Sequence, residues 1–265
     1  MITVGIDVGS ITTKAVLLTD TTWQSLLLPT GCSPRESGKS VFEQILNRAG
    51  LSPADVNYVV GTGYGRISLP FIDKAITEIT CHARGAHHLV NGTDMVVDIG
   101  GQDSKVILID EQGSVMNFAM NDKCAAGTGR FLQVMAAVLG ADVSELADLA
   151  RGAESVQISS MCTVFAESEV VSLLAQGVPK ERIIAGIHRS VASRVASMAE
   201  RLGRGERLTF TGGVARNDGV REFLSRELGQ EITVAPEPQL AGALGAALLA
   251  RDRCKQTLVT LDEIH

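Results

Sequence analysis

The sequence lacks three features that mark familiar classes of protein: paired cysteines, basic runs and long apolar stretches. Its five cysteines are scattered without any C-x-x-C pair, at Cys32, Cys81, Cys124, Cys162 and Cys254. An odd number without paired spacing argues against a disulfide framework, and against a zinc or ferredoxin-type cluster site built by one chain. We therefore expect these thiols to be reduced or shared with another molecule.

Positive charge and aromatic side chains are both scarce. The formal net charge is −6, only 4% of the residues are aromatic, and no Lys/Arg run is present to follow a phosphate backbone. The longest apolar stretch, Ala241 to Ala250, covers about ten residues, whereas a membrane helix needs roughly 20. We expect a soluble cytoplasmic protein that binds neither nucleic acid nor a membrane.

The remaining composition is that of an ordinary folded protein. With 45% hydrophobic and 20% charged residues over 265 positions, the chain can form one or two compact domains and is not globally disordered. Apolar β-branched runs predict strands at 2–8, 12–18, 25–28, 56–60, 95–99, 105–109, 115–120, 208–211 and 232–234. Helical spacing predicts helices at 40–49, 82–90, 128–139, 143–150, 165–175, 179–202 and 243–253. Strands mixed with helices, without a Pro/Ser linker, indicate an α/β fold.

An internal repeat is the most informative feature. The segment Asp7–Leu18, DVGSITTKAVLL, matches Asp98–Ile109, DIGGQDSKVILI, position for position. The matched pairs are Asp7 with Asp98, Gly9 with Gly100, Thr13 with Ser104 and Lys14 with Lys105. Because the two copies are much further apart than the roughly 20–50 residues of a solenoid repeat, the chain is predicted to contain two similar halves.

Each copy of the repeat is a strand that ends in aspartate and turns through glycine. Glycines let backbone N–H groups approach an anion, and nearby hydroxyls and lysine add donors and charge. A carboxylate at the strand end can hold Mg²⁺, directly or through water, or orient water toward a γ-phosphate. One such turn is common, but two matching copies predict a phosphate clamp. Lys14 and Lys105 can instead be solvated strand charges, the interpretation we favour for Lys105.

Two later glycine segments suit an adenosine site. Phe210–Asn217, FTGGVARN, lies at the end of a predicted strand and before a helix. Its glycines can therefore admit a flat adenine and ribose, while the helix N-terminus favours negative charge. Ala241–Ala247, AGALGAA, permits close helix packing around such a pocket. Both segments can also be packing devices only.

Two other motifs look like nucleotide-binding loops without meeting the requirements. Ser33–Ser40, SPRESGKS, ends like a Walker A loop, but it has serine where the first glycine is required and Pro34 inside the loop. Gly61–Gly65, GTGYG, lacks the spacing of a dinucleotide fingerprint. We interpret the second motif as a tight turn near the nucleotide cleft.

Taken together, the segments that begin at Asp7, Asp98, Thr211 and Ala241 resemble the phosphate 1, phosphate 2 and adenosine motifs of the acetate kinase, sugar kinase, Hsp70 and actin superfamily. Within it, the sequence is most similar to the ATPase activators of 2-hydroxyacyl-CoA dehydratases, the BadF/BadG/BcrA/BcrD-type family, which is related to the ATPase subunits of benzoyl-CoA reductase. Five segments carry this closer match: Gly61–Arg66, Glu78–Ala83, Asp98–Asp103, Asn121–Arg130 and Ser159–Glu167. The resemblance covers nearly the whole chain, and the segment around Cys124 is highly specific.

The resemblance implies the architecture. It corresponds to an α/β fold of two duplicated actin-like, or ribonuclease H-like, domains around a nucleotide cleft. Residues 1–92 plus 242–265 would form domain I. Residues 93–241 would form domain II, which carries the two cysteines discussed next.

The resemblance also implies a homodimer that holds one [4Fe–4S] cluster at its interface, with two cysteines from each subunit. The corresponding positions here are Cys124 and Cys162. The residue count agrees, since such a cluster needs four thiolates and two per chain on a two-fold axis supply them. Both cysteines precede predicted helices, whose N-termini stabilise thiolates. The other three cysteines are expected to be small buried apolar residues.

The implied function is that of an ATP-hydrolysing iron–sulfur activator. It would bind ATP and ADP with Mg²⁺ near Asp7 and Asp98, take an electron from ferredoxin or flavodoxin, and pass it to a dehydratase component with its own iron–sulfur cluster. Asp7, Asp98 and Gln102 are the candidate catalytic residues, and either Gln102 or a neighbouring carboxylate would orient the attacking water. The candidate nucleotide-binding residues are Gly9, Ser10, Thr12, Thr13, Lys14, Gly100, Gly101, Gln102, Gly127, Gly212, Gly213, Val214, Asn217 and Gly242.

Two other functions stay open at this stage. An ATP-dependent small-molecule kinase of the same superfamily would use Asp98 as a base toward a hydroxyl, but the chain shows no inserted sugar-binding segment and its cysteine pair would be idle. A regulatory ATPase without a cluster is the other. Glu78 and His82 can cap a helix or line an interface, and the sequence does not separate these roles.

Overall fold

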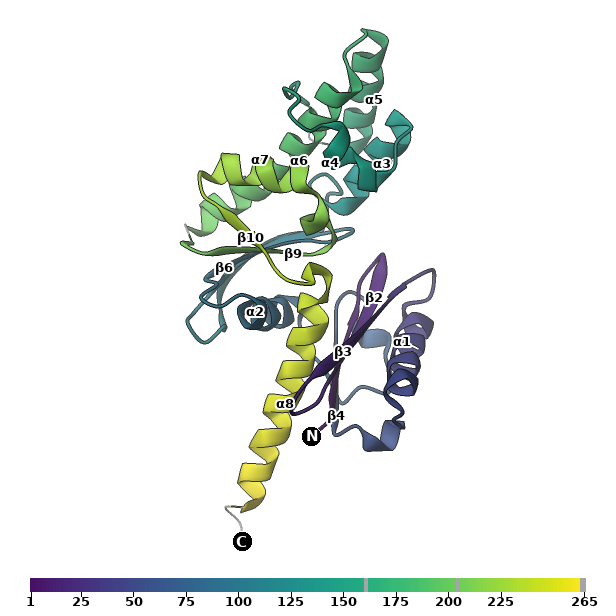
Figure 1. Ribbon diagram of the computed structural model, residues 1–265, viewed down its shortest axis with the longest axis vertical. Coiled ribbons are helices and arrows are strands. Elements are labelled where there is room, and N and C mark those ends of the chain that lie inside the picture. Colours follow the sequence, from purple (N-terminus) through teal and green to yellow (C-terminus); the bar gives the residue numbers. More distant parts are fainter. Residues whose placement is uncertain (160–161, 204, 263–265) are drawn as a thin grey trace. The chain divides into compact units, whose positions relative to one another are not determined.

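The computed structural model describes residues 1–159, 162–203 and 205–262, and the chain divides into two compact units (Figure 1). Unit 1 comprises Met1–Thr93, Ile109–Val115 and Ala235–His265. Unit 2 comprises Asp94–Leu108 and Met116–Val234. Within the described ranges, we find no helix with both the length and the apolar character that a membrane span requires.

The two units are built on sheets of the same topology. In unit 1 the order is β3-β2-β1-β4-β5, from β1 (Thr3–Val8), β2 (Thr12–Leu18), β3 (Trp23–Pro29), β4 (Tyr58–Thr62) and β5 (Lys74–Ala75). In unit 2 it is β8-β7-β6-β9-β10, from β6 (Met95–Ile99), β7 (Ser104–Ile109), β8 (Val115–Asn121), β9 (Leu208–Thr211) and β10 (Ile232–Val234). In both, the first strand pairs antiparallel with the second and parallel with the fourth. The prediction of two similar halves is confirmed.

Helices cover both faces of the unit 1 sheet. The helices are α1 (Pro34–Ala49), α2 (Glu78–Leu89) and α8 (Ala241–Asp262). Because side chains alternate along a strand, Ile6 packs in the core with Ile45 of α1, while Val16 packs with Leu244 and Leu248 of α8. Figure 1 shows α2 and α8 side by side, and a Cβ on Gly245 would lie only 1.8 Å from the backbone oxygen of Cys81. The small residues of Ala241–Ala247 thus give the close helix packing that we expected.

The helix predicted from residue 40 begins earlier, at Pro34. The Ser33 hydroxyl caps it by accepting a hydrogen bond from the Glu36 amide at 3.3 Å. Pro34 is the first residue of the helix, a position where a backbone N–H would have no partner inside the helix, so its absence in proline costs nothing. The segment that ends like a Walker A loop is therefore the start of α1. The sequence prediction missed this start because it relied on apolar spacing rather than on the cap.

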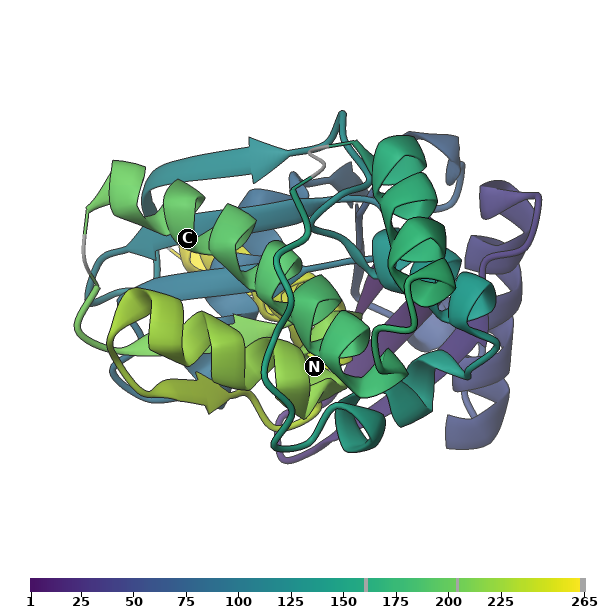
Figure 2. The same ribbon diagram turned by 90° about the horizontal axis from the view of Figure 1, so that it is seen from above.

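The helices of unit 2 follow the predicted order. They are α3 (Gly129–Leu139), α4 (Leu146–Leu149), α5 (Thr163–Ala175), α6 (Lys180–Leu202) and α7 (Asp218–Leu228). Figure 2 shows α6 and α7 running side by side. Their buried residues Val195 and Leu224 belong to one core with Val97 and Ile99 of β6. This core holds the end of β6, where the second copy of the repeat turns.

Candidate functional site

The first turn of the repeat lies in unit 1, between β1 and β2. Asp7 is buried at the end of β1 and is the register partner of Lys14, whose Nζ lies 3.4 Å from Asp7 Oδ2. Gly9 closes the turn by donating from its amide to the Thr12 carbonyl at 3.1 Å. Ser10 and Thr12 are both partly exposed, so their polar groups are accessible beside the buried carboxylate.

Backbone packs closely around Asp7. A Cβ on Gly63 would lie 2.3 Å from Asp7 Oδ1, and one on Gly242 of α8 would lie 2.9 Å from Oδ2. Gly63 also has a φ of +82°, which most residues avoid. The segment Gly61–Gly65 is thus a tight turn against Asp7, and glycine at 242 brings α8 to the same carboxylate.

Thr13 supports this turn through a chain of buried hydrogen bonds. Its fully buried hydroxyl is 2.9 Å from that of Thr30 and accepts from the Ser37 hydroxyl at 2.7 Å. Thr30 in turn donates to the Gly9 carbonyl at 2.7 Å. The sequence pattern does not single out Thr30 or Ser37, because β3 and α1 bring them to Thr13 only in the folded chain.

The second turn lies in unit 2 and repeats the first with tighter electrostatics. Asp98 and Lys105 are register partners, and Lys105 Nζ lies 3.3 Å from Asp98 Oδ2 and 2.8 Å from Asp103 Oδ2. The Thr211 hydroxyl donates to Asp98 Oδ1 at 2.8 Å. Lys105 is only 2% exposed, so our expectation of a solvated strand charge was wrong. Two carboxylates hold its ammonium group inside the protein.

The adenosine segment adjoins the second turn. Gly212 has a φ of +89°, and a Cβ there would lie 2.3 Å from the Ile99 carbonyl oxygen and 3.0 Å from Asp98 Oδ1. The neighbouring Gly213 is exposed, whereas Val214 is buried in the core. Asn217 caps α7 by accepting from the Val220 amide at 3.0 Å. Unit 2 therefore brings the second phosphate turn and the adenosine segment together.

The second turn is also joined to α3. The Gly100 carbonyl accepts from the Gly129 amide at 2.9 Å, and the Gly101 carbonyl accepts from the Arg130 amide at 2.8 Å. Gln102 lies exposed in this turn. Gly127 lies just before α3, and a Cβ on Gly127 would be 3.2 Å from Arg194 Cδ. The first turn of α3 is thus fixed to the glycines that we expect to bind phosphate.

Cys124 and Cys162 both lie before helices of unit 2, as predicted. The Asn121 side chain holds the backbone of Cys124, donating to its carbonyl at 2.8 Å and accepting from its amide at 3.3 Å, five residues before α3. Cys162 is exposed and is the N-cap residue of α5. Ser160 and Met161 of the surrounding motif lie outside the described residues.

The other three cysteines differ from one another. None of the five, all of which the structure describes, forms a disulfide, and Cys81 is fully buried, as we expected. Burial raises the pKa of the Cys81 thiol to about 12. Cys32, however, is exposed in the turn before α1, so its assignment as a buried apolar residue was wrong, and Cys254 is only partly buried. Cys32 lies in the turn between β3 and α1 and does not reach the core. The apolar character of cysteine, on which the expectation was based, does not show where in the fold the residue lies.

No group of three or more His, Cys, Asp or Glu side chains that could hold a metal ion occurs among the residues that the structure describes. Mg²⁺ does not require such a group, since it keeps several waters and is commonly held by one or two carboxylates together with substrate phosphates. Asp7 and Asp98 fit that smaller role. Glu78 lies in the first turn of α2, whose N-cap is Thr77, and His82 lies buried further along the same helix.

Two sheets of identical topology, each with an Asp–Gly turn and a facing lysine, define the class as the duplicated actin-like fold. A ROK family glucokinase from Streptomyces griseus shares this fold at 16% identity, with a TM-score of 0.54 over 95% of this chain and 100% of that one. The chain belongs to the BadF/BadG/BcrA/BcrD ATPase family, which it matches over residues 4–250. The family resemblance and the fold class are thus confirmed.

Two relatives show how similar the chain is to members of this family. The chain is 50% identical over 252 residues to the (R)-2-hydroxyglutaryl-CoA dehydratase activating ATPase of Acidaminococcus fermentans, covering 94% of this chain and 96% of that protein. The structure of the activator of the 2-hydroxyisocaproyl-CoA dehydratase from Clostridium difficile with bound ADPNP is 45% identical, with a TM-score of 0.89 over 98% of both chains. The likeness to the glucokinase concerns the fold alone, so the kinase alternative is not favoured.

Proposed function

We propose that this protein is an ATP-hydrolysing iron–sulfur activator that drives low-potential electron transfer to a 2-hydroxyacyl-CoA dehydratase-type partner. The observation that carries the proposal is the pair of matching buried contacts, Asp7 with Lys14 and Asp98 with Lys105, each beside a glycine turn. Relatives that are dehydratase activators cover almost the whole chain. The partner would be a dehydratase component, and the electron donor a ferredoxin or flavodoxin.

The nucleotide would bind through the two turns. The Ser10 amide, with the Thr12 hydroxyl and Lys14, would hold phosphate on one side, and the Gly101 amide on the other. The Gly9 and Gly100 amides, which donate to the Thr12 and Asp103 carbonyls, would instead hold the two turns in shape. Because glycine has no Cβ, an anion can approach the backbone at Gly9, Gly100 and Gly101 closely, which supports this assignment.

Mg²⁺ would bind chiefly to phosphate oxygens and water, near Asp7 and Asp98. Lys105 and Thr211 already contact the two oxygens of Asp98, so Asp98 would act on the metal through water. Gln102, exposed in its turn, would orient the attacking water.

The catalytic assignment is tested by ATP turnover in aspartate variants. We expect Asp7→Asn and Asp98→Asn each to lower Mg-dependent ATP hydrolysis by about a hundredfold or more, because each removes charge at the transferred phosphate. Asp148→Asn is the control, since Asp148 is 76% exposed on α4. Unchanged turnover in the Asp7 or Asp98 variant would remove that residue from the mechanism.

The residues present fit half of a [4Fe–4S] site. Neither Cys124 nor Cys162 forms a disulfide, both lie in unit 2, and Cys162 is exposed at the N-terminus of α5. Two such ligands per chain require a second copy to complete four. When bound, the cluster would supply one-electron redox chemistry.

The surface of α5 supports such a dimer. Val164, Phe165 and Val171 are 66%, 68% and 52% exposed on the helix that Cys162 caps. Exposed apolar residues gathered in this way mark an interaction surface. We therefore propose that α5 packs against a second copy of the chain in a homodimer.

Anaerobic reconstitution tests the cluster separately from the ATPase. We expect the parent to bind about two iron and two sulfide per chain, one cluster per dimer, with a brown colour. Cys124→Ala and Cys162→Ala should each lose most of this iron, whereas Cys32→Ala, which removes another exposed thiol, should keep it. Parent levels of iron in either ligand variant would overturn the assignment. Colourless, iron-free protein that phosphorylates a sugar would favour the kinase alternative.

Coupling between the two sites would run through α3. Its first turn is hydrogen bonded to Gly100 and Gly101, and Cys124 lies five residues before it. Phosphate contacts differ between ATP and ADP, so a shift of this turn would move α3 and the Cys124 segment with it. Hydrolysis would thereby change the environment of Cys124, one of the two residues that would hold the cluster.

A further inference from the structure

A groove of about 1140 Å³ lies in unit 2, between the end of β8, residues 156–159 and α6. Small and polar residues form its α6 side, Gly186, Ser190, Ser193 and Ser197. A Cβ on Gly186 would lie 2.5 Å from the Val156 carbonyl oxygen, so the segment that starts at Val156 packs closely on α6. This segment and the last residues of β8 form the two other sides of the groove.

Basic residues outnumber acidic ones along the groove. Its lining contains one acidic side chain, Asp122, and four basic ones, Lys123, Arg189, Arg194 and Arg201. Arg189 is paired with Glu227 at 3.3 Å. Lys123 and Arg201 are exposed, and neither forms an ion pair within the part of the chain that the structure describes. Because the whole chain has a formal charge of −6, the groove is a local region of positive charge on an acidic protein.

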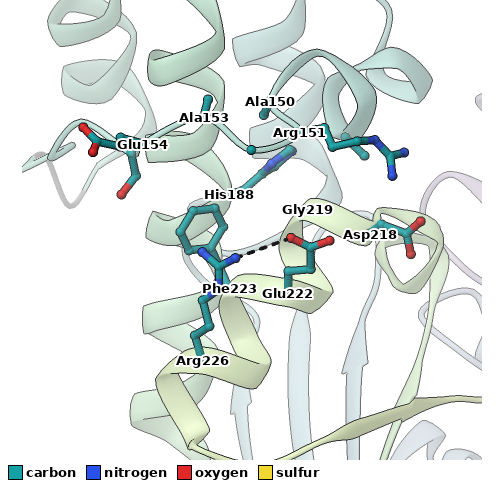
Figure 3. Close-up of a pocket in the computed structure, with 13 residues that line it drawn as sticks. Ala150, Arg151, Ala153, Glu154, His188, Asp218, Gly219, Glu222, Phe223 and Arg226 are labelled. Carbon is teal, nitrogen blue, oxygen red and sulfur yellow. Dashed lines mark ion pairs between the residues drawn. The ribbon is translucent and has the colours of Figure 1, made fainter.

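A second cavity of unit 2, of about 450 Å³, is charged differently (Figure 3). Both of its arginines are paired with acidic residues, Arg226 with Glu222 and Arg151 with Asp148. Two further acidic residues line it, Glu154 and Asp218. Of these two cavities, only the groove beside β8 therefore carries a surplus of positive charge.

The groove adjoins the segment that carries Cys124. Asn121 lines the groove, and its side chain donates to the Cys124 carbonyl at 2.8 Å and accepts from the Cys124 amide at 3.3 Å. Lys123 directly precedes the same cysteine in the chain. A molecule bound in the groove would thus lie beside one of the residues that we propose as cluster ligands.

Apolar side chains of β8 are exposed next to the groove. Met116 and Phe118 are 70% and 50% exposed, and the alternation of side chains along a strand places them on the same face as Met120, which lines the groove. β8 is also an edge strand of its sheet. Methionine, aromatic residues and arginine are enriched in protein interfaces, and exposed apolar patches mark interaction sites. The basic groove and the exposed face of β8 together have the character of a protein-docking surface.

We propose that this surface docks the electron donor, a small electron-transfer protein with an acidic surface. The inference rests on the proposed function and deepens it, since it assigns the donor a place on this chain. A donor must arrive quickly and leave again, and complementary charge speeds association without a large interface. An acidic donor would be repelled by the net charge of the chain elsewhere and attracted at the groove.

A second copy of the chain fits the groove less well than an acidic donor does. Two copies related by a two-fold axis present the same residues to each other. A contact centred on the groove would therefore bring Lys123 and Arg201 of one copy opposite the same cations of the other, which is unfavourable.

The first experiment measures donor binding by calorimetry, with the full-length protein after anaerobic reconstitution. The probes are an acidic flavodoxin and an acidic ferredoxin, both oxidised so that no electron is transferred. We expect the parent to bind at least one of them at low salt, and Lys123→Glu and Arg201→Glu each to weaken that binding about tenfold. Raising the salt to about 0.5 M should remove most of the difference, because salt screens exposed charges.

Lys39→Glu and Arg35→Glu are the matched controls, since they make the same changes of charge at exposed positions of α1. Both should bind the probe like the parent. Equal losses in the groove and control variants, or a parent that binds neither probe, would overturn the inference. So would groove variants that keep the probe but lose binding to an (R)-2-hydroxyglutaryl-CoA dehydratase, because the groove would then serve the electron acceptor.

The second experiment locates the contact by cross-linking. A carbodiimide joins a lysine amine to a carboxylate that touches it, and peptide mass spectrometry identifies the lysine. We expect Lys123 to be linked to the probe, with or without iron in the protein, and Lys39 to stay unlinked. Links at Lys39 and none at Lys123 would overturn the inference.

The inference and the proposed function fail in different ways. ATP turnover and iron content are measured on the same preparations. A parent without either would remove the proposed function. Normal turnover and iron, with probe binding that the groove variants leave unchanged, would remove only the docking surface.

Discussion

Asp98 and Lys105 face each other across β6 and β7, with 3.3 Å between Oδ2 and Nζ and almost no exposure of either side chain. Asp7 and Lys14 repeat the contact in unit 1 at 3.4 Å, but the Lys14 side chain is 13% exposed. Only Lys105 has a second carboxylate, that of Asp103 at 2.8 Å. The duplicated turn is therefore more deeply buried and more dependent on its lysine in unit 2.

Replacing Lys105 should destabilise the protein strongly. Lys105→Met would leave the buried Asp98 carboxylate and the partly exposed Asp103 carboxylate without their shared cation. Breaking a buried pair in this way typically costs roughly 3–5 kcal/mol. We expect a loss of that size in the free energy of unfolding measured with urea, and a smaller loss for Lys14→Met. Lys39→Met is the control, since the Lys39–Glu43 pair is exposed and contributes little. A Lys105 variant as stable as the Lys39 variant would contradict the electrostatic account.

The sequence predicts this turn better than it predicts what surrounds it. The repeat placed Asp7 and Asp98 at strand ends because a strand that ends in aspartate and glycine is a local pattern. The burial of Lys105 cannot be read from the local sequence. It depends on the contact of its ammonium group with Asp103, and on β9, which brings Thr211 to Asp98. The contact of the His188 ring with Asn217 is harder still to predict, because Asn217 caps α7 and lies 29 residues later in the chain.

Cysteine reactivity should follow exposure rather than position in the sequence. We expect iodoacetamide to label Cys32 and Cys162 rapidly in the native apoprotein, because both are exposed. Cys81 should stay unmodified until the protein unfolds, because burial raises its pKa to about 12 and excludes the reagent. Peptide mass spectrometry before and after addition of urea measures each site. Native labelling of Cys81 at the rate of Cys32 would show that α2 and α8 separate readily.

The close contact of α2 with α8 predicts a steric effect at Gly245. A Cβ there would lie 1.8 Å from the Cys81 carbonyl oxygen, so Gly245→Ala must push the two helices apart. We expect a loss of about 1–3 kcal/mol or more in the free energy of unfolding, despite the higher helix propensity of alanine. Gly85→Ala should behave alike, because its Cβ would lie 1.9 Å from the Ala241 carbonyl oxygen. A gain in thermal stability in either variant would contradict this packing.

The buried imidazole of His188 should make the protein sensitive to acid. Burial lowers its pKa from 6.5 to about 4, with no charged partner contributing. Between these two pH values the unfolded chain binds a proton that the folded protein does not, so the free energy of unfolding falls as the pH drops through 6.5 toward 4. His188→Asn cannot titrate and should lose less stability over this window, by an amount on the order of 2–3 kcal/mol. Urea unfolding of both proteins at pH 7 and pH 4.5, without nucleotide, measures the difference. If the two proteins lose equal stability between these pH values, His188 is protonated in the folded state, which would contradict its burial as a neutral imidazole.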